Sequence, residues 1–338
     1  MIGGGNSRGG KLRPLLLAGP LAFACAALWP AASQAFIGCS YSAGKLNVTL
    51  NETDDTVRIA RGGSAINVIA TGPFGEGPSV LLTCAGGSAT VTNTDLIAVE
   101  EAATARFGFV SFELGGGQFA PGATPEADGT SEIELRANMY GPDDAIQVIA
   151  TGTADAIHVG RLPNGATGAN LNALGEAAPD VDLEMVGTPV VGVSAGAGND
   201  VVRGRGSAGF AGPARIPIVA FGGPGRDLLM AGRVTSLISG AGGRDTILGS
   251  RGRDFLDAGR GRDLIKAGKG GDFVFALRGG EDRINCGGSQ DVGLVERKDR
   301  RRSCENSRNA INAVEETQFS TVVREHSFNA AAKVLRRK

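Results

Sequence analysis

Hydrophobic and polar positions follow a fixed nine-residue pattern between residues 196 and 291. In each unit an aspartate ends a glycine-rich stretch, and an aliphatic residue lies two places after it, as in Asp245 with Ile247 and Asp254 with Leu256. A fixed period with one apolar position per unit predicts a solenoid of stacked repeats. The aliphatic positions are Val202, Leu229, Ile247, Leu256, Ile265, Val274 and Ile284.

Each unit predicts one turn and one short strand. Glycine tolerates positive φ and allows a sharp turn, and in the three extended residues that follow only the middle side chain points inward. Two units then make one coil, and coils stack about 4.8 Å apart. Aspartates eighteen residues apart should therefore lie above one another, with Asp227, Asp245 and Asp263 on one edge and Asp254 and Asp272 on the other.

Stacked carboxylates require a positive partner. At an effective dielectric near 20, two carboxylates about 5 Å apart repel by roughly 3 kcal/mol. We therefore expect a cation, either a metal ion or an arginine, beside each row of aspartates.

The units resemble the RTX, or haemolysin-type, calcium-binding repeat, whose consensus is Gly-Gly-x-Gly-x-Asp-x-aliphatic-x. The resemblance implies an all-β fold, a right-handed parallel β-roll or β-solenoid, with Ca²⁺ held between turns by aspartates and glycine-turn carbonyls. Such hard oxygen ligands in a flexible turn suit Ca²⁺. The candidate metal ligands are Asp200, Asp227, Asp245, Asp254, Asp263, Asp272, Asp282 and Asp291.

The repeats depart from the family in their charge. Arginine precedes several of the aspartates, at Arg226, Arg244, Arg253 and Arg262, and residues 221–291 carry eleven basic against nine acidic side chains. A net positive charge opposes the capture of a cation. The alternative is a metal-independent structural or adhesive solenoid in which Arg–Asp salt bridges neutralise the rows. Ser236 occupies one aspartate position, and residues 204–217 break the period.

Residues 1–35 have the pattern of a secretory signal peptide. Arg8, Lys11 and Arg13 precede an apolar stretch over residues 15–28, and Ser33-Gln34-Ala35 is a small-x-small cleavage site. The apolar stretch is too short to span a membrane. We expect a secreted, extracellular or cell-surface protein.

Three further regions follow. Residues 36–190 carry nineteen acidic and six basic side chains and short alternating strand patterns, which predict either a degenerate solenoid or a β-sandwich. Residues 191–291 form the roll, and residues 292–338 a basic cap or tail. Phe255, Phe273 and Phe275 flank inward positions, so they should be exposed on the outer face unless the tail covers them.

Four cysteines remain after the predicted cleavage. An exported chain is expected to form disulfides, and three pairings are possible. The economical choice is Cys39 with Cys84 and Cys286 with Cys304.

The sequence offers little catalytic chemistry. Ser194 lies in a Gly-x-Ser-x-Gly string, but glycine repeats follow where that motif requires a helix. His158 and His326 are the only histidines. We therefore predict a non-enzymatic calcium-binding protein, with a secreted hydrolase carrying an RTX tail as the least favoured alternative. Its expected partners are Ca²⁺ and cell-surface or extracellular polymers, with no specific nucleic acid and no membrane span.

Overall fold

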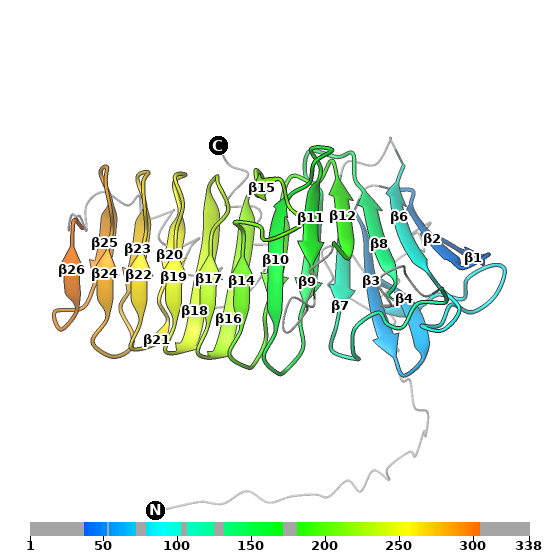
Figure 1. Ribbon diagram of the computed structural model, residues 1–338, viewed down its shortest axis with the longest axis horizontal. Coiled ribbons are helices and arrows are strands. Elements are labelled where there is room, and N and C mark those ends of the chain that lie inside the picture. The colour runs from blue at the N-terminus through cyan, green and yellow to red at the C-terminus, as the bar shows by residue number, and fades with distance from the viewer. Residues whose placement is uncertain are drawn as a thin grey trace, which may run out of the picture. The chain divides into compact units, whose positions relative to one another are not determined.

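The computed structural model describes residues 37–304 except 53, 72–78, 103–106, 125–131 and 172–180. All of them belong to one unit, Ala35–Lys338. The predicted signal peptide and residues 305–338 of the predicted tail, which was expected to begin at residue 292, lie outside the described residues. Within those residues the regular structure consists of strands in two sheets (Figure 1).

The first sheet has fourteen strands. In spatial order they are β1 (Gly38–Ser42), β2 (Lys45–Leu50), β6 (Leu96–Glu101), β8 (Glu134–Asn138), β12 (Leu183–Val186), β11 (Thr167–Asn170), β10 (Ala156–Arg161), β14 (Val201–Arg203), β17 (Leu228–Met230), β19 (Thr246–Leu248), β22 (Leu264–Lys266), β24 (Arg283–Asn285) and β26 (Arg300–Arg302), with β15 (Gly212–Pro213) paired to β10.

The second sheet has twelve strands. In spatial order they are β25 (Val292–Val295), β23 (Phe273–Ala276), β20 (Phe255–Asp257), β18 (Ser236–Gly243), β16 (Ile218–Gly225), β13 (Val191–Ser194), β9 (Ala145–Ile149), β7 (Gly108–Glu113), β3 (Asp55–Gly62), β4 (Ala65–Thr71) and β5 (Val80–Leu81), with β21 (Arg260–Gly261) paired to β18.

From β16 onwards successive strands alternate between the two sheets, except that β20 and the short β21 both belong to the second, so that each coil contributes to both sheets. Neighbouring strands are parallel. Leu229 pairs with Ile247 and Ile247 with Ile265 in the first sheet, an offset of eighteen residues. The same offset pairs Leu256 with Val274 in the second. The predicted parallel β-roll of nine-residue units, two to a coil, is confirmed.

The acidic N-terminal region continues the same coil. Strands β2, β6 and β8 pair in parallel in the first sheet, and β3, β7 and β9 in the second. Antiparallel additions interrupt the coil, namely the hairpins β1–β2 and β3–β4 and the β10–β11–β12 meander. Of the two architectures expected for this region, the structure therefore has the solenoid and not the sandwich.

A single apolar core fills the space between the sheets from Ile37 to Cys286. The aliphatic position of each repeat lies in it, and Leu229, Ile247, Leu256 and Ile265 are fully buried. Burial of one such side chain per unit, worth about 1.5–3 kcal/mol each, holds every coil to its neighbours.

A second apolar cluster lies on the opposite face of the second sheet. Phe255, Phe273 and Phe275 belong to it and are only 6–8% exposed, and the rings of Phe255 and Phe273 stack with centroids 5.1 Å apart. The side chains point away from the core as predicted, and of the two states expected for them, exposed or covered, the structure has the covered one.

Two disulfides lie near the ends of the described stack. Cys39 bonds to Cys84, and Cys286 bonds to Cys304, which are the local pairs that the sequence favoured. The second bond joins the residue that follows β24 to the second residue after β26. Among the described residues, no helix has the length and apolar character needed to cross a membrane.

Candidate functional site: the aspartate ladders

One edge of the roll carries a continuous ladder of buried aspartates. The backbone N–H of Asp227 donates to Asp245 Oδ1 at 2.9 Å, and that of Asp245 donates to Asp263 Oδ1 at 2.8 Å. The same bond links Asp200 to Asp227 and Asp263 to Asp282. Each carboxylate thus binds the turn of the preceding coil, and the predicted alignment on this edge holds.

The opposite edge carries a second, shorter ladder. Ser236 N–H donates to Asp254 Oδ1, Asp254 N–H to Asp272 Oδ1 and Asp272 N–H to Asp291 Oδ1, at 2.8–2.9 Å. Ser236 occupies the first aspartate position on this edge, so it joins the ladder through its backbone N–H and supplies no carboxylate. The eight candidate ligands are therefore divided between the edges, five on the first and three on the second.

The first ladder extends further than the repeats suggested. Asp155 N–H donates to Asp200 Oδ1 at 2.9 Å, and Asp282 N–H donates to Asp299 Oδ1 at 3.1 Å. Sequence reasoning assigned neither Asp155 nor Asp299 to the ladder, because their intervals to the adjacent ladder aspartate are 45 and 17 residues and not eighteen. For Asp155 a signal was available in the similarity of Asp-Ala-Ile-Gln-Val at residues 144–148 to Asp-Ala-Ile-His-Val at residues 155–159.

The second carboxylate oxygen of most ladder aspartates has no partner. The Oδ2 atoms of Asp200, Asp227, Asp245, Asp263, Asp272 and Asp282 are buried without a hydrogen bond in the described structure. Burial raises the pKa of Asp245 and Asp272 to about 7 and that of Asp263 to about 6. Neighbouring aspartates raise these pKa values further, and the backbone hydrogen bonds lower them. Ionised, these carboxylates need a positive partner.

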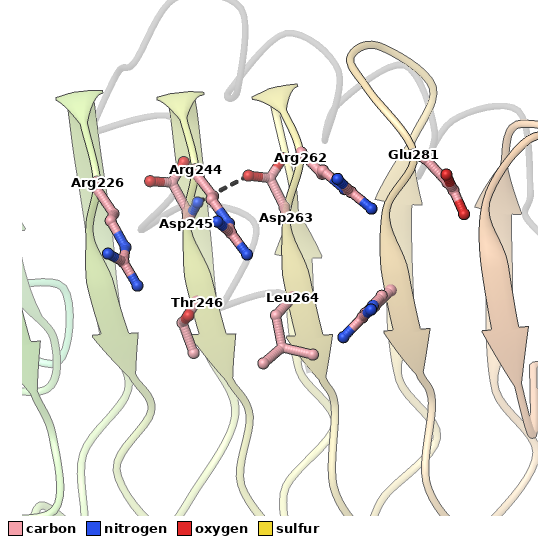
Figure 2. A pocket seen from close by; sticks show the side chains of 9 residues that line it. Arg226, Arg244, Asp245, Thr246, Arg262, Asp263, Leu264 and Glu281 are labelled. Carbon is pink, nitrogen blue, oxygen red and sulfur yellow. Dashed lines mark hydrogen bonds between the residues drawn. The ribbon is translucent and has the colours of Figure 1, made fainter.

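The arginines beside the ladder do not supply that partner. Figure 2 shows Arg226, Arg244 and Arg262 with Asp245 and Asp263 around a pocket of about 300 Å³. All three arginines are exposed, and within the described ranges none forms an ion pair with a ladder aspartate. The salt-bridged rows expected for the metal-independent alternative are not formed at these three arginines.

The donor set along the ladder suits a hard cation. A Cβ added at Gly240 would lie 2.6 Å from Asp245 Oδ2 and 2.7 Å from the Ala258 carbonyl oxygen, so two oxygens of adjacent coils converge there. Ca²⁺ takes six to eight oxygens at about 2.3–2.6 Å. The described residues hold no group of three His, Cys, Asp or Glu side chains that could bind a metal. Backbone carbonyls would have to supply most of the ligands.

Asp254 differs from the other ladder aspartates. Its Oδ1 accepts a hydrogen bond from Ser236 N–H at 2.8 Å, and its Oδ2 accepts one from Ser250 N–H at 2.6 Å. In Asp272, on the same edge, only Oδ1 accepts a backbone hydrogen bond, and Oδ2 is without one. Both carboxylate oxygens of Asp254 thus accept backbone hydrogen bonds, whereas only one oxygen of Asp272 does.

Comparison with protein families identifies the repeats. Residues 193–208, 221–256 and 239–274 match the family described as RTX calcium-binding nonapeptide repeat (4 copies). This part of the chain consists of RTX repeats. The resemblance drawn from the sequence is confirmed, and Ca²⁺ is the ion expected for such repeats. Searches of curated proteins and of solved structures returned no match.

The structure does not place Ser194 in a nucleophile elbow. This serine ends β13, and its Oγ accepts a hydrogen bond from Gln147 Nε2 at 2.9 Å. The next element is strand β14, not the helix that a nucleophile elbow requires. His158 lies on β10, with a pKa lowered by burial and by Arg203.

Proposed function

We propose that the protein is an exported, extracellular and non-enzymatic repeat protein whose β-roll is completed by Ca²⁺. The observation that carries the proposal is the row of buried Oδ2 atoms without a hydrogen-bond partner in the RTX repeats. An ionised carboxylate is costly to bury unless it is paired or coordinates a metal. The described arginines do not pair with this row, and the repeats belong to a calcium-binding family.

The proposed ligands are the aspartates with an open Oδ2 together with carbonyl oxygens of the glycine turns. When bound, Ca²⁺ would supply positive charge between adjacent coils. The protein's own part is to fix Oδ1 through the backbone hydrogen bond, so that Oδ2 is held in one place. The favoured sites lie in the matched repeats, at Asp200, Asp227, Asp245, Asp263 and Asp272. Asp282 extends the row, and Asp254 and Asp291 remain candidates.

Binding should stabilise the fold by mass action, because the unfolded chain has no preformed sites. For one site, a ligand at one hundred times its Kd stabilises the folded state by about 2.7 kcal/mol. We expect the purified protein, residues 36–338, to melt at a higher temperature in Ca²⁺ than in EDTA. Mg²⁺ at the same concentration should have a smaller effect, because it demands a near-ideal octahedron and keeps its waters.

The decisive comparison uses two variants. Asp245→Asn with Asp263→Asn keeps the side-chain volume and removes two ladder charges, and it should weaken Ca²⁺ binding measured by calorimetry. Glu134→Gln removes an exposed carboxylate of β8, outside the ladders, and should bind Ca²⁺ as the parent does. Equal melting temperatures in EDTA and Ca²⁺ would instead leave a metal-independent surface scaffold as the better function.

Export is tested separately from calcium binding. The N-terminal pattern and the two disulfides both support an oxidising destination outside the cytoplasm. Full-length chain expressed in a secreting bacterial host should be recovered from the medium with Phe36 as its first residue. Recovery of uncleaved chain from the cytoplasm alone would contradict export.

A further inference from the structure

In the roll most acidic side chains are buried, and most basic side chains are exposed to solvent. Of the nine acidic side chains in residues 221–291, the seven ladder aspartates are buried, and Asp257 and Glu281 are partly buried. Of the eleven basic side chains, ten are exposed, and Arg253 is half-buried against the rings of Phe255 and Phe273. The solvent therefore meets a far more positive surface than the near balance in the sequence suggests.

The positive charge is most concentrated in a groove along the second edge. The groove has a volume of about 830 Å³, and its lining contains five exposed basic side chains and no carboxylate. They are Arg205, Arg233, Arg251, Lys266 and Lys269. One of them is held in place, because Arg205 Nη2 donates to the Gly249 carbonyl oxygen at 3.1 Å.

Three of these side chains recur at the same position of successive coils. Arg233, Arg251 and Lys269 are eighteen residues apart. The coils stack in register here, since Lys269 N–H donates to the Ser250 carbonyl at 3.0 Å and Gly249 N–H to that of Lys266 at 2.8 Å. Neighbouring strands lie about 4.8 Å apart, so this row of three presents one cation per coil along the axis of the roll.

We propose that this groove binds a linear anionic polysaccharide. A row of evenly spaced cations in an open groove matches a polymer with repeated negative groups better than a small ligand with one. The coil spacing is close to the length of one sugar ring in a polymer. No aromatic side chain lines the groove, so bases of a nucleic acid have no surface on which to stack. Arg and Lys bind sulfate or carboxylate through charge-assisted hydrogen bonds.

The arginines of the first edge provide a comparison within the molecule. Arg226, Arg244 and Arg262 also recur every eighteen residues, but their pocket contains Asp245, Asp263 and Glu281 as well (Figure 2). Negative groups on a polymer would meet these carboxylates there. The proposal concerns the second edge only, and none of its five basic residues is a proposed Ca²⁺ ligand.

The test measures binding of the mature protein to dextran sulfate and carboxymethyl dextran, with unmodified dextran as the control of identical backbone. Ca²⁺ is kept saturating throughout. The variant R233Q/R251Q/K269Q should lose at least about tenfold in affinity for both anionic polymers. The matched variant R226Q/R244Q/R262Q removes the same charge from the first edge and should lose much less. Affinity should fall as salt is raised.

Each other outcome overturns the proposal. Equal losses in the two variants would mean diffuse attraction to the whole surface and not a groove. Binding of an oligothymidylate of the same charge as tightly as the sulfated polymer would favour nucleic acid. Absence of binding would remove the site. Calorimetry with Ca²⁺ on both variants separates this proposal from the calcium function, because the ladder is untouched, and thermal melting confirms that both fold.

Discussion

The backbone N–H of Asp245 donates to Asp263 Oδ1 at 2.8 Å across adjacent coils. Each of the eight predicted ladder aspartates thus has two different oxygens: Oδ1 fixes the turn of the preceding coil, while Oδ2 in most of them is left for another partner. The structural role should therefore persist without metal, whereas the proposed role in binding Ca²⁺ should not.

Removing one carboxylate should destabilise the metal-free protein. In Asp263→Ala the buried Asp245 N–H loses its acceptor, which costs about 1–3 kcal/mol. Urea denaturation in EDTA measures the change, with Glu134→Ala, at an exposed position of β8, as the control outside the ladders. Equal stabilities of the Asp263 variant and its parent in EDTA would show that the ladder bond contributes nothing.

Stability of the metal-free protein should fall as pH rises. Burial raises the pKa of Asp245 and Asp272 to about 7 and that of Asp200, Asp263 and Asp282 to about 6, above the ordinary value of 3.8. A pKa raised by folding gives stability at low pH that is lost as the pH passes through the folded value. In excess EDTA the melting temperature should therefore be higher at pH 5 than at pH 8.

Saturating Ca²⁺ should reverse that order, because the ion binds the deprotonated carboxylates. The variant Asp245→Asn with Asp272→Asn should flatten the slope in EDTA. A melting temperature in EDTA that rises from pH 5 to pH 8 would contradict the burial of these groups.

Two adjacent glycines should respond differently to alanine. Gly243 has φ near 138°, and a Cβ there would overlap the Gly225 carbonyl oxygen of the preceding coil. At Gly242 the nearest atom to an added Cβ is the Arg260 carbonyl oxygen, 4.0 Å away. Gly243→Ala should lower the melting temperature strongly or prevent folding, while Gly242→Ala should stay within about 1 kcal/mol of the parent. Similar melts for the two variants would argue against the close approach of these turns.

Replacing Asp254 and replacing Asp272 by asparagine should have different effects on stability and on Ca²⁺ binding. Both oxygens of Asp254 accept backbone hydrogen bonds, whereas Asp272 Oδ2 has none. Asp254→Asn should therefore weaken the fold in EDTA more than Asp272→Asn, because its amide nitrogen would face a backbone donor. Asp272→Asn should have the larger effect on Ca²⁺ binding in calorimetry. The reverse ranking would mean that hydrogen bonding does not decide which aspartates bind the ion.

The regular part of the roll could be predicted from the sequence because the nine-residue period alone determines which residues stack on each other. With nine residues per unit and two units per coil, the aliphatic residues and aspartates each fall into register, as Ile247 with Ile265 and Asp245 with Asp263 do. The family match follows from the same pattern. Nothing in this reasoning depends on contacts distant in sequence.

Where the nine-residue period is interrupted, the sequence could not show which aspartates bond to each other. Asp155 and Asp200 are 45 residues apart because the β10–β11–β12 meander intervenes, and only the fold brings them together. The sequence also left open whether the phenylalanines are exposed or covered. Their outward direction follows from strand alternation, but Phe255 and Phe273 are buried, and alternation along one strand does not determine what covers its outer face.

The two disulfides matter because of where they lie in a one-dimensional stack. An interior coil has a neighbour on each side, whereas a terminal coil has one and is the first to fray. Cys39–Cys84 holds the first hairpin, and Cys286–Cys304 closes the last described coil. Both ends of the described stack are thus covalently clamped, so a terminal strand stays tethered to its neighbour even when its hydrogen bonds open.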